Sequence, residues 1–234
     1  MSVYSFSTHA AQTENPEEGG LRIQVTSTIG LIPIPNATIT IYYETAPDSP
    51  IQELTTDSSG QTQVIQLPAP PIAYSLEPGS PRPYAEYIIR VSAPGYETVV
   101  VSGSEILPEV TSLQNIQLPP LEVSNGAEED INIGPHTLYY DYPPKIPEAE
   151  IKPMDETGEI VLSRVVIPEY VIVHDGEPDD ASAPNYYVRY KDYIKNVASC
   201  EIYATWPESA IYANILAIMS FTLNRVYTEW YRNQ

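Results

Sequence analysis

The clearest pattern in the chain is an alternation of apolar and polar positions between residues 20 and 120. Leu21, Ile23 and Val25 have polar neighbours on both sides, and similar alternation or short apolar runs return in residues 37–43, 61–67, 87–91, 97–102 and 113–118. A period of two residues is typical of strands with one buried face. Turn residues such as Asp57-Ser58-Ser59-Gly60 separate these segments. Short strands at regular spacing predict an all-β sandwich for residues 20–120.

The period changes near the C-terminal end of the chain. Tyr190, Ile194, Val197 and Ala198 recur at helical spacing and predict an amphipathic helix. Thr205-Trp206-Pro207-Glu208 has the form of a capping box and predicts the start of a second helix, with Pro207 in its first turn. This second helix is apolar on most faces, which is typical of a buried core helix.

The segments between these elements complete the predicted domain plan. Residues 121–160 hold ten acidic residues, two Lys and five Pro, a composition typical of an extended linker. We therefore expect a flexible leader (1–19), a β-sandwich (20–120), an acidic Pro-rich linker (121–160) and a truncated domain (161–234). The predicted fold class is multi-domain: an all-β sandwich followed by a mostly α-helical, incomplete C-terminal domain.

The charge of the chain narrows the range of partners. The 234 residues include 31 acidic and 11 basic ones, a formal net charge of −20. The excess lies mostly in residues 121–188, with fifteen acidic against three basic residues, whereas residues 189–234 have five basic and four acidic ones. Nucleic-acid binding requires clustered Lys and Arg, so no nucleic acid is expected as a partner.

Other features of the sequence argue against disulfides, a metal site, a membrane span and a signal peptide. A single Cys and three His leave no disulfide framework and make a Cys-rich zinc site implausible, so we predict no metal and no cofactor. The most apolar stretch, residues 210–223, is too short to span a bilayer. The first twenty residues lack a basic start and an apolar run, so no signal peptide is predicted. We expect synthesis in the cytoplasm, and the final location of the protein stays open.

Three features are candidates for chemistry. Glu201 lies between the two predicted helices, and apolar neighbours would raise the pKa of its carboxyl as a general acid requires; the alternative is a solvent-exposed Glu at a helix end. The acidic segment from His174 to Asp180 departs from the spacing of a calcium loop and is better explained as solvated. Cys200 is either a small buried residue or a metal ligand or redox thiol.

Several aromatic residues surround these candidates. Tyr203 and Trp206 are the predicted substrate-binding residues, because an aromatic ring offers an apolar face on which a ligand can stack. They would share this role with Tyr227, Trp230 and Tyr231. At helical spacing such residues are more often part of a core.

Two stretches resemble known families. The succession Pro35-Asn36-Ala37, Thr56-Asp57-Ser58-Ser59-Gly60-Gln61-Thr62 and Ala93-Pro94-Gly95-Tyr96 resembles the carboxypeptidase regulatory-like, or transthyretin-like, domain, which implies a non-catalytic sandwich. The run from Asp192-Tyr193-Ile194-Lys195 through Glu201, Trp206-Pro207-Glu208, Ala213-Asn214 and Ala217 resembles the N-terminal part of the stage II sporulation protein D / amidase-enhancer domain.

The second resemblance implies a lytic transglycosylase that acts on peptidoglycan glycan strands stripped of their peptides, with Glu201 as the catalytic acid. Met219-Ser220 stands where that family has Arg-Thr, and Tyr212 where it has Lys. Such departures favour an alternative, a non-catalytic peptidoglycan-binding or scaffold protein with a degenerate lytic domain. A third possibility is a structural sandwich with an orphan helical tail. Sporulation or cell-wall remodelling is the expected context, and glycan strands the expected partner.

Overall fold

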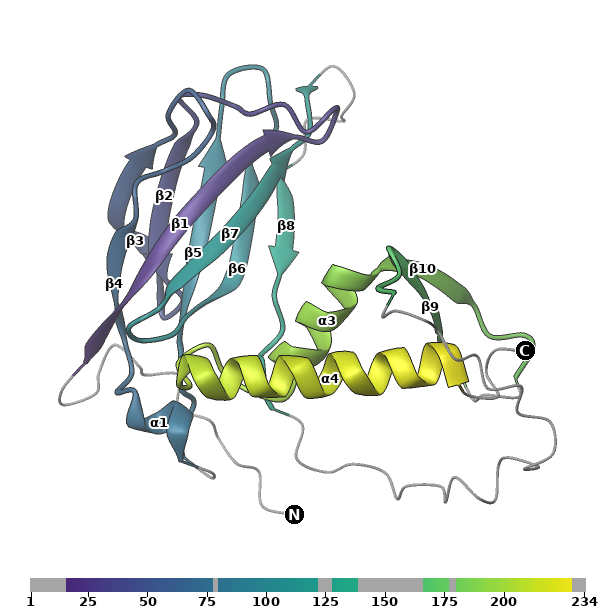
Figure 1. Cartoon of the computed structure of the whole chain (residues 1–234). Coiled ribbons are helices and arrows are strands. Elements are labelled where there is room, and N and C mark those ends of the chain that lie inside the picture. Colours follow the sequence, from purple (N-terminus) through teal and green to yellow (C-terminus); the bar gives the residue numbers. More distant parts are fainter. Residues whose placement is uncertain (1–15, 78–79, 122–127, 139–165, 177–179, 229–234) are drawn as a thin grey trace, which may run out of the picture. The chain divides into compact units, whose positions relative to one another are not determined.

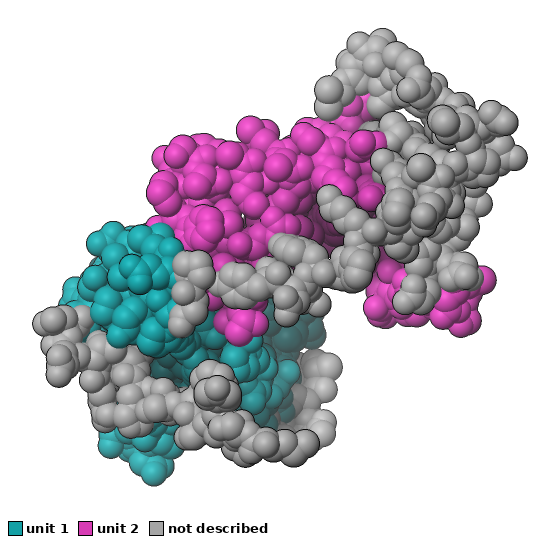
Figure 2. All heavy atoms as spheres, turned by 90° about the horizontal axis from the view of Figure 1, so that it is seen from below, with its two compact units in different colours: residues 1–135 teal, residues 136–234 magenta. Residues whose placement is uncertain are grey.

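The computed structural model describes residues 16–77, 80–121, 128–138, 166–176 and 180–228 (Figure 1). It divides into two compact units, residues 1–135 and 136–234, which Figure 2 shows in different colours. Each unit has its own cluster of buried apolar residues, so each is described by itself.

Two sheets form the first unit. One has the order β4-β1-β7 and consists of β4 (Ile65–Ala69), β1 (Glu17–Ser27) and β7 (Thr111–Leu118). The other has the order β3-β2-β5-β6-β8 and consists of β3 (Ala46–Thr55), β2 (Thr38–Tyr43), β5 (Ala85–Ser92), β6 (Val99–Ile106) and β8 (Glu129–Asn132). A short helix, α1 (Ala73–Leu76), follows β4.

The alternating positions of the sequence form the core of this sandwich. Leu21, Ile23 and Val25 of β1 are at most 1% exposed, and Ile39, Ile41, Ile89 and Val91 are fully buried on the facing sheet. In the β2–β5 ladder Ile39 pairs with Val91 and Ile41 with Ile89, so the apolar positions of both strands share one face. The prediction of strands from this alternation is confirmed for β1, β2, β5 and β7.

The turn at residues 57–60 is held by side chains as well as by backbone. Asp57 Oδ1 accepts hydrogen bonds from the Ser59 and Gln61 amides and from the Ser59 hydroxyl, and these bonds lower the pKa of Asp57. Gly60 has φ +73°, and a Cβ there would meet the Val25 carbonyl oxygen at 2.4 Å. Only glycine fits this close approach to β1.

Two strands of the first unit lie where the sequence pattern did not predict them. β3 is an edge strand with an almost wholly exposed burial pattern and two Pro, so no alternation marks it. β8 falls inside the stretch predicted as a linker, and its four exposed residues pair in parallel with β6. In addition, β1 begins at Glu17, inside the stretch predicted as a leader.

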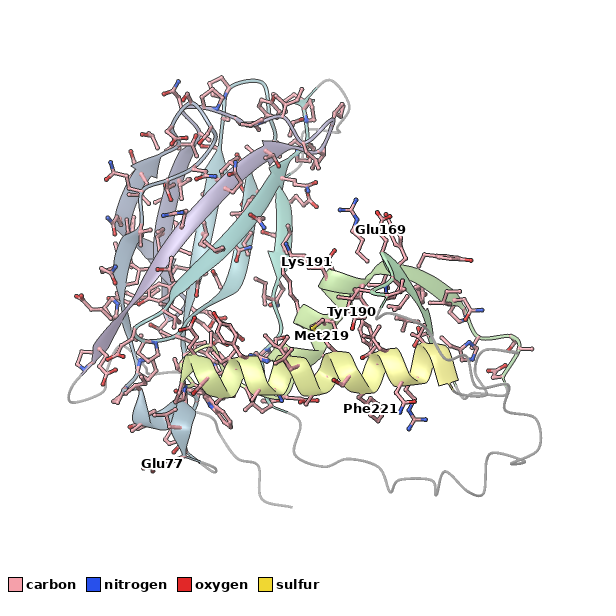
Figure 3. All side chains as sticks on the ribbon, viewed as in Figure 1. Glu77, Glu169, Tyr190, Lys191, Met219 and Phe221 are labelled. Carbon is pink, nitrogen blue, oxygen red and sulfur yellow. The ribbon has the colours of Figure 1, made fainter. Side chains whose placement is uncertain are left out.

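The second unit combines a hairpin with two helices. β9 (Tyr170–His174) and β10 (Asn185–Arg189) pair antiparallel, and α3 (Tyr190–Ser199) and α4 (Glu208–Thr228) follow. Buried Val171, Tyr190, Ile194 and Ile218 form its core, so strand and helix residues share one cluster. The Tyr190 hydroxyl donates to the Met219 carbonyl at 3.4 Å, and both residues are labelled in Figure 3.

The predicted fold class is wrong. The described residues are mostly β and form three sheets, and the C-terminal unit is not a mostly α-helical domain, because it includes the β9–β10 sheet. The physical reason is that α3 and α4 need a further layer to bury their apolar sides. Val171 of β9 is part of the buried cluster, and Val173 and Val188 pack against it.

Among the described helices, none has the length and apolar character needed to cross a membrane.

Candidate functional site

The end of α3 fixes the backbone at Glu201. The Cys200 amide donates to the carbonyls of Asn196 (3.3 Å) and Val197 (3.1 Å), and the amides of Glu201 and Ile202 both donate to the Ala198 carbonyl at 3.1 Å. These bonds continue the helical turn beyond Ser199. Glu201 is therefore attached to a rigid element although it lies in a connecting segment.

The following residues lead directly into α4. The Trp206 amide donates to the Tyr203 carbonyl at 3.2 Å, and the amides of Ala210 and Ile211 donate to the Pro207 carbonyl. The first helical bond of α4 (Glu208–Thr228) ends on the Pro207 carbonyl, so Pro207 stands at the N-terminal boundary of the helix, where its missing N–H costs no helical hydrogen bond. The connection between the helices is short and is held by the backbone at both ends.

The Glu201 carboxylate contacts the side chain of Asn214. Asn214 Nδ2 donates to Glu201 Oε2 at 2.8 Å, and both residues are partly buried. Asn214 lies in the second turn of α4, 13 positions along the chain from Glu201. This bond brings together two side chains that are distant in the sequence, at the junction of α3 and α4.

The oxygen atom of the Asn214 amide has no observed hydrogen-bond donor among the described residues. This atom, Oδ1, is buried. A buried acceptor without a donor costs about 1–3 kcal/mol, and Asn is also a weaker helix former than Ala or Leu. Asn214 therefore lowers the stability of α4, and its contact with Glu201 is the one favourable polar interaction that we observe for it.

Tyr203 is placed differently from the open platform that the sequence suggests. It is 8% exposed, and its ring meets the His136 ring edge-on with 5.5 Å between the ring centroids. His136 Nε2 lies 2.6 Å from the Ser199 carbonyl oxygen. The Tyr203 ring is therefore part of the packing that holds the connection between α3 and α4.

Trp206 is half-buried, and its role as a substrate-binding residue stays a prediction. The side chain of Tyr227, together with Trp230 and Tyr231, lies outside the described residues.

Cys200 is a half-buried free thiol at the C-cap of α3. Of the acidic segment, Asp180 accepts hydrogen bonds from the Ser182 amide and hydroxyl, which lowers the pKa of Asp180. Residues 177–179 lie outside the described part.

Asn214 is the site residue to which sequence reasoning assigned no role. It was visible as a polar interruption of the apolar stretch 210–223. An amide inside an otherwise apolar helix is a signal that its side chain has a specific partner. The identity of the partner required the tertiary structure.

Comparisons with known proteins give only distant likenesses. No family model and no curated protein matches the chain. Among solved structures, the Bacillus anthracis TIE protein is 22% identical over 44% of this chain and 17% of its own, with a TM-score of 0.30. The Streptococcus agalactiae minor pilin GBS52 is 16% identical over 45% of this chain and 46% of its own, with a TM-score of 0.32.

Catechol 1,2-dioxygenase from Acinetobacter sp. ADP1 is 14% identical over 52% of this chain and 60% of its own, with a TM-score of 0.32. The chain spans less than two thirds of each of these three structures. Likeness at this level carries no information about function.

Proposed function

We propose that the protein cleaves peptidoglycan glycan strands by a lytic transglycosylase-type reaction, with Glu201 as the catalytic acid. The observation that supports this proposal most is the hydrogen bond between Asn214 and Glu201. It joins two positions of the sporulation-protein-D-like pattern that are distant in the sequence. A partly buried carboxyl with one fixed partner has a defined orientation, which general acid catalysis requires.

The reaction needs a single carboxyl group. Glu201 in its acid form gives its proton to the glycosidic oxygen while the bond from that oxygen to C1 breaks. The C6 hydroxyl of the same sugar attacks C1, a C1–O6 bond forms, and the hydroxyl proton passes to the Glu201 carboxylate. Because the nucleophile belongs to the substrate, its effective concentration is high and no second carboxylate is needed to supply it.

The charge of the surrounding segment is compatible with a glycan substrate. Residues 189–234 are nearly neutral, in contrast to the strongly acidic stretch before them. A muramic acid unit carries a carboxylate, so a glycan strand is anionic and an acidic surface would repel it. Along the sequence, most of the acidic residues lie outside residues 189–234.

The test uses the full chain with purified, peptide-free glycan strands. We expect products that end in 1,6-anhydromuramic acid, and we expect Glu201→Gln to lower their rate of formation by about 100-fold or more, since the variant has no proton to donate. Glu169→Gln is the matched control, because Glu169 is an exposed carboxyl of the same unit and lies outside the pattern around Glu201. Equal rates for Glu201→Gln and wild type would remove the catalytic role of Glu201.

Glycan binding without cleavage would instead support the alternative, a non-catalytic peptidoglycan-binding protein. Sedimentation of the chain with insoluble glycan measures this directly. In that case Glu201→Gln and wild type would sediment equally while neither forms anhydro products.

A further inference from the structure

Glu201 lies at a helix end and has Asn214 as its hydrogen-bond donor. Glu201 follows the C-terminal end of α3, where the helix dipole presents its negative end. A carboxylate in this position gains no stabilisation from the helix and depends on a separate donor. Among the described residues, Asn214 Nδ2 is the donor observed for it.

The orientation of the Asn214 amide is assigned by this contact. With Glu201 ionised, only the NH2 group can face Oε2, since a carboxylate accepts hydrogen bonds and cannot donate them. Oδ1 then lies on the buried side without a donor. If the amide turns over about χ2, Oδ1 faces Glu201 instead. That orientation is favourable when Glu201 is protonated, because a carboxylic acid has an O–H to donate.

An amide can therefore serve as partner to both protonation states of Glu201. Leu at this position could serve neither state, and Asp would place a second negative charge beside Glu201. Such a partner suits a catalytic acid that gives up its proton and regains it in each cycle. The buried, unpaired Oδ1 is the cost of holding such a partner inside α4.

We propose that Asn214 is the positioning residue of Glu201, which it holds from α4 in both protonation states. This inference rests on the proposed function, because positioning matters only if Glu201 performs the acid step. It also concerns a group that does not touch the sugar itself. Asn214 acts on the reaction through Glu201.

The kinetic test compares Asn214→Leu, Asn214→Asp and Asn214→Gln in the full chain with peptide-free glycan. We expect Asn214→Leu and Asn214→Asp to lower kcat by about 10- to 100-fold with KM nearly unchanged, since a misplaced acid reacts slowly with substrate that is bound normally. Asn214→Gln keeps both a donor and an acceptor, so it should recover part of the loss. Asn224→Leu, an exposed position on the same helix, is the matched control.

Thermal unfolding separates positioning from a structural role. Asn214→Leu removes the unpaired buried acceptor and, with it, the donor to Glu201. These two effects on stability oppose each other, so its Tm should stay close to that of wild type while its kcat falls. A kcat loss that follows a lowered Tm in all three variants would overturn the inference. Wild-type kcat in Asn214→Leu would also overturn it.

A spectroscopic measurement tests the contact without any turnover. The side-chain amide resonances of Asn214 in ¹H–¹⁵N spectra should move in Glu201→Gln, because the bond to a charged acceptor is lost, whereas those of Asn224 should not. Unmoved Asn214 resonances would overturn the contact itself.

Wild-type cleavage by Glu201→Gln, or a chain that cleaves no glycan, overturns the proposed function and this inference with it. Loss of cleavage in Glu201→Gln together with normal kcat in Asn214→Leu overturns this inference alone.

Discussion

Glu44 illustrates how a single residue in the sandwich responds to its surroundings. It follows the last residue of β2, and its carboxyl hydrogen-bonds the Glu86 carboxyl on β5, which also forms an ion pair with Arg82. This hydrogen bond, partial desolvation of the carboxyl and the charge of Glu86 together raise the pKa of Glu44 to about 7, and Arg82 acts in the opposite direction. Two carboxyl groups that share a hydrogen bond need one proton between them.

The first prediction concerns the pH dependence of stability. Glu44 of the native protein keeps its proton up to about pH 7, whereas an unperturbed Glu loses it near 4.5. The native state therefore binds more protons across this window, and the free energy of unfolding falls as pH rises through it. We expect Glu44→Gln to lose this part of the decline in Tm between pH 4.5 and pH 7.

Glu53→Gln on β3 is the control and should keep the wild-type profile, because Glu53 is an exposed strand residue. If Tm of Glu44→Gln declines with pH as steeply as that of wild type, the Glu44–Glu86 contact does not set the dependence.

At the scale of elements, α4 differs from its sequence prediction. Its sequence is apolar on most faces and predicted a buried helix, yet Tyr212, Leu216 and Phe221 are 57–61% exposed. Phe221 points away from α3 in Figure 3, and the Arg225 guanidinium lies over its ring at 4.8 Å from the centroid. Ile218 and Thr222 form the buried side. When apolar residues lie on most faces of a helix, the sequence does not indicate which face packs against the rest of the protein.

The second prediction compares the two sides of α4. Ile218→Ala should lower the free energy of unfolding of the C-terminal unit by about 2–5 kcal/mol, because it creates a cavity among Val171, Tyr190 and Ile194. Leu216→Ala, with a side chain that is 61% exposed, should change it by less than about 0.5 kcal/mol. Urea denaturation followed by circular dichroism measures both. Equal losses would mean that Leu216 is covered in solution.

The whole molecule contains two separate buried clusters. The cluster of the sandwich includes Ile39, and the cluster of the C-terminal unit includes Ile218, with no residue in common. Cooperative unfolding follows from shared buried contacts, so separate cores favour separate transitions.

The third prediction follows from these separate clusters. Calorimetry of the full chain should show two transitions, with Ile39→Ala lowering the Tm of one and Ile218→Ala the Tm of the other. Ile39 is fully buried, so its replacement by Ala should cost about 2–5 kcal/mol within its own unit. A single transition that both variants lower would show that the two units unfold together.

The sequence by itself determined the features that depend on short-range periodicity. The alternation at Leu21, Ile23 and Val25 placed a strand with one buried face, and helical spacing placed α3 with Tyr190 and Ile194 inside. In both cases the period of the backbone alone decides which side a residue faces. Edge strands such as β3 have both faces largely exposed, so no such signal marks them.

Only the tertiary structure decided which distant segments meet. It completed the C-terminal unit with the β9–β10 sheet, buried the Tyr203 ring beside His136, and placed Asn214 against Glu201. Each of these contacts joins residues whose local pattern is satisfied in many arrangements. Burial of apolar surface across the whole unit selects among those arrangements, and a short sequence window does not contain that free energy.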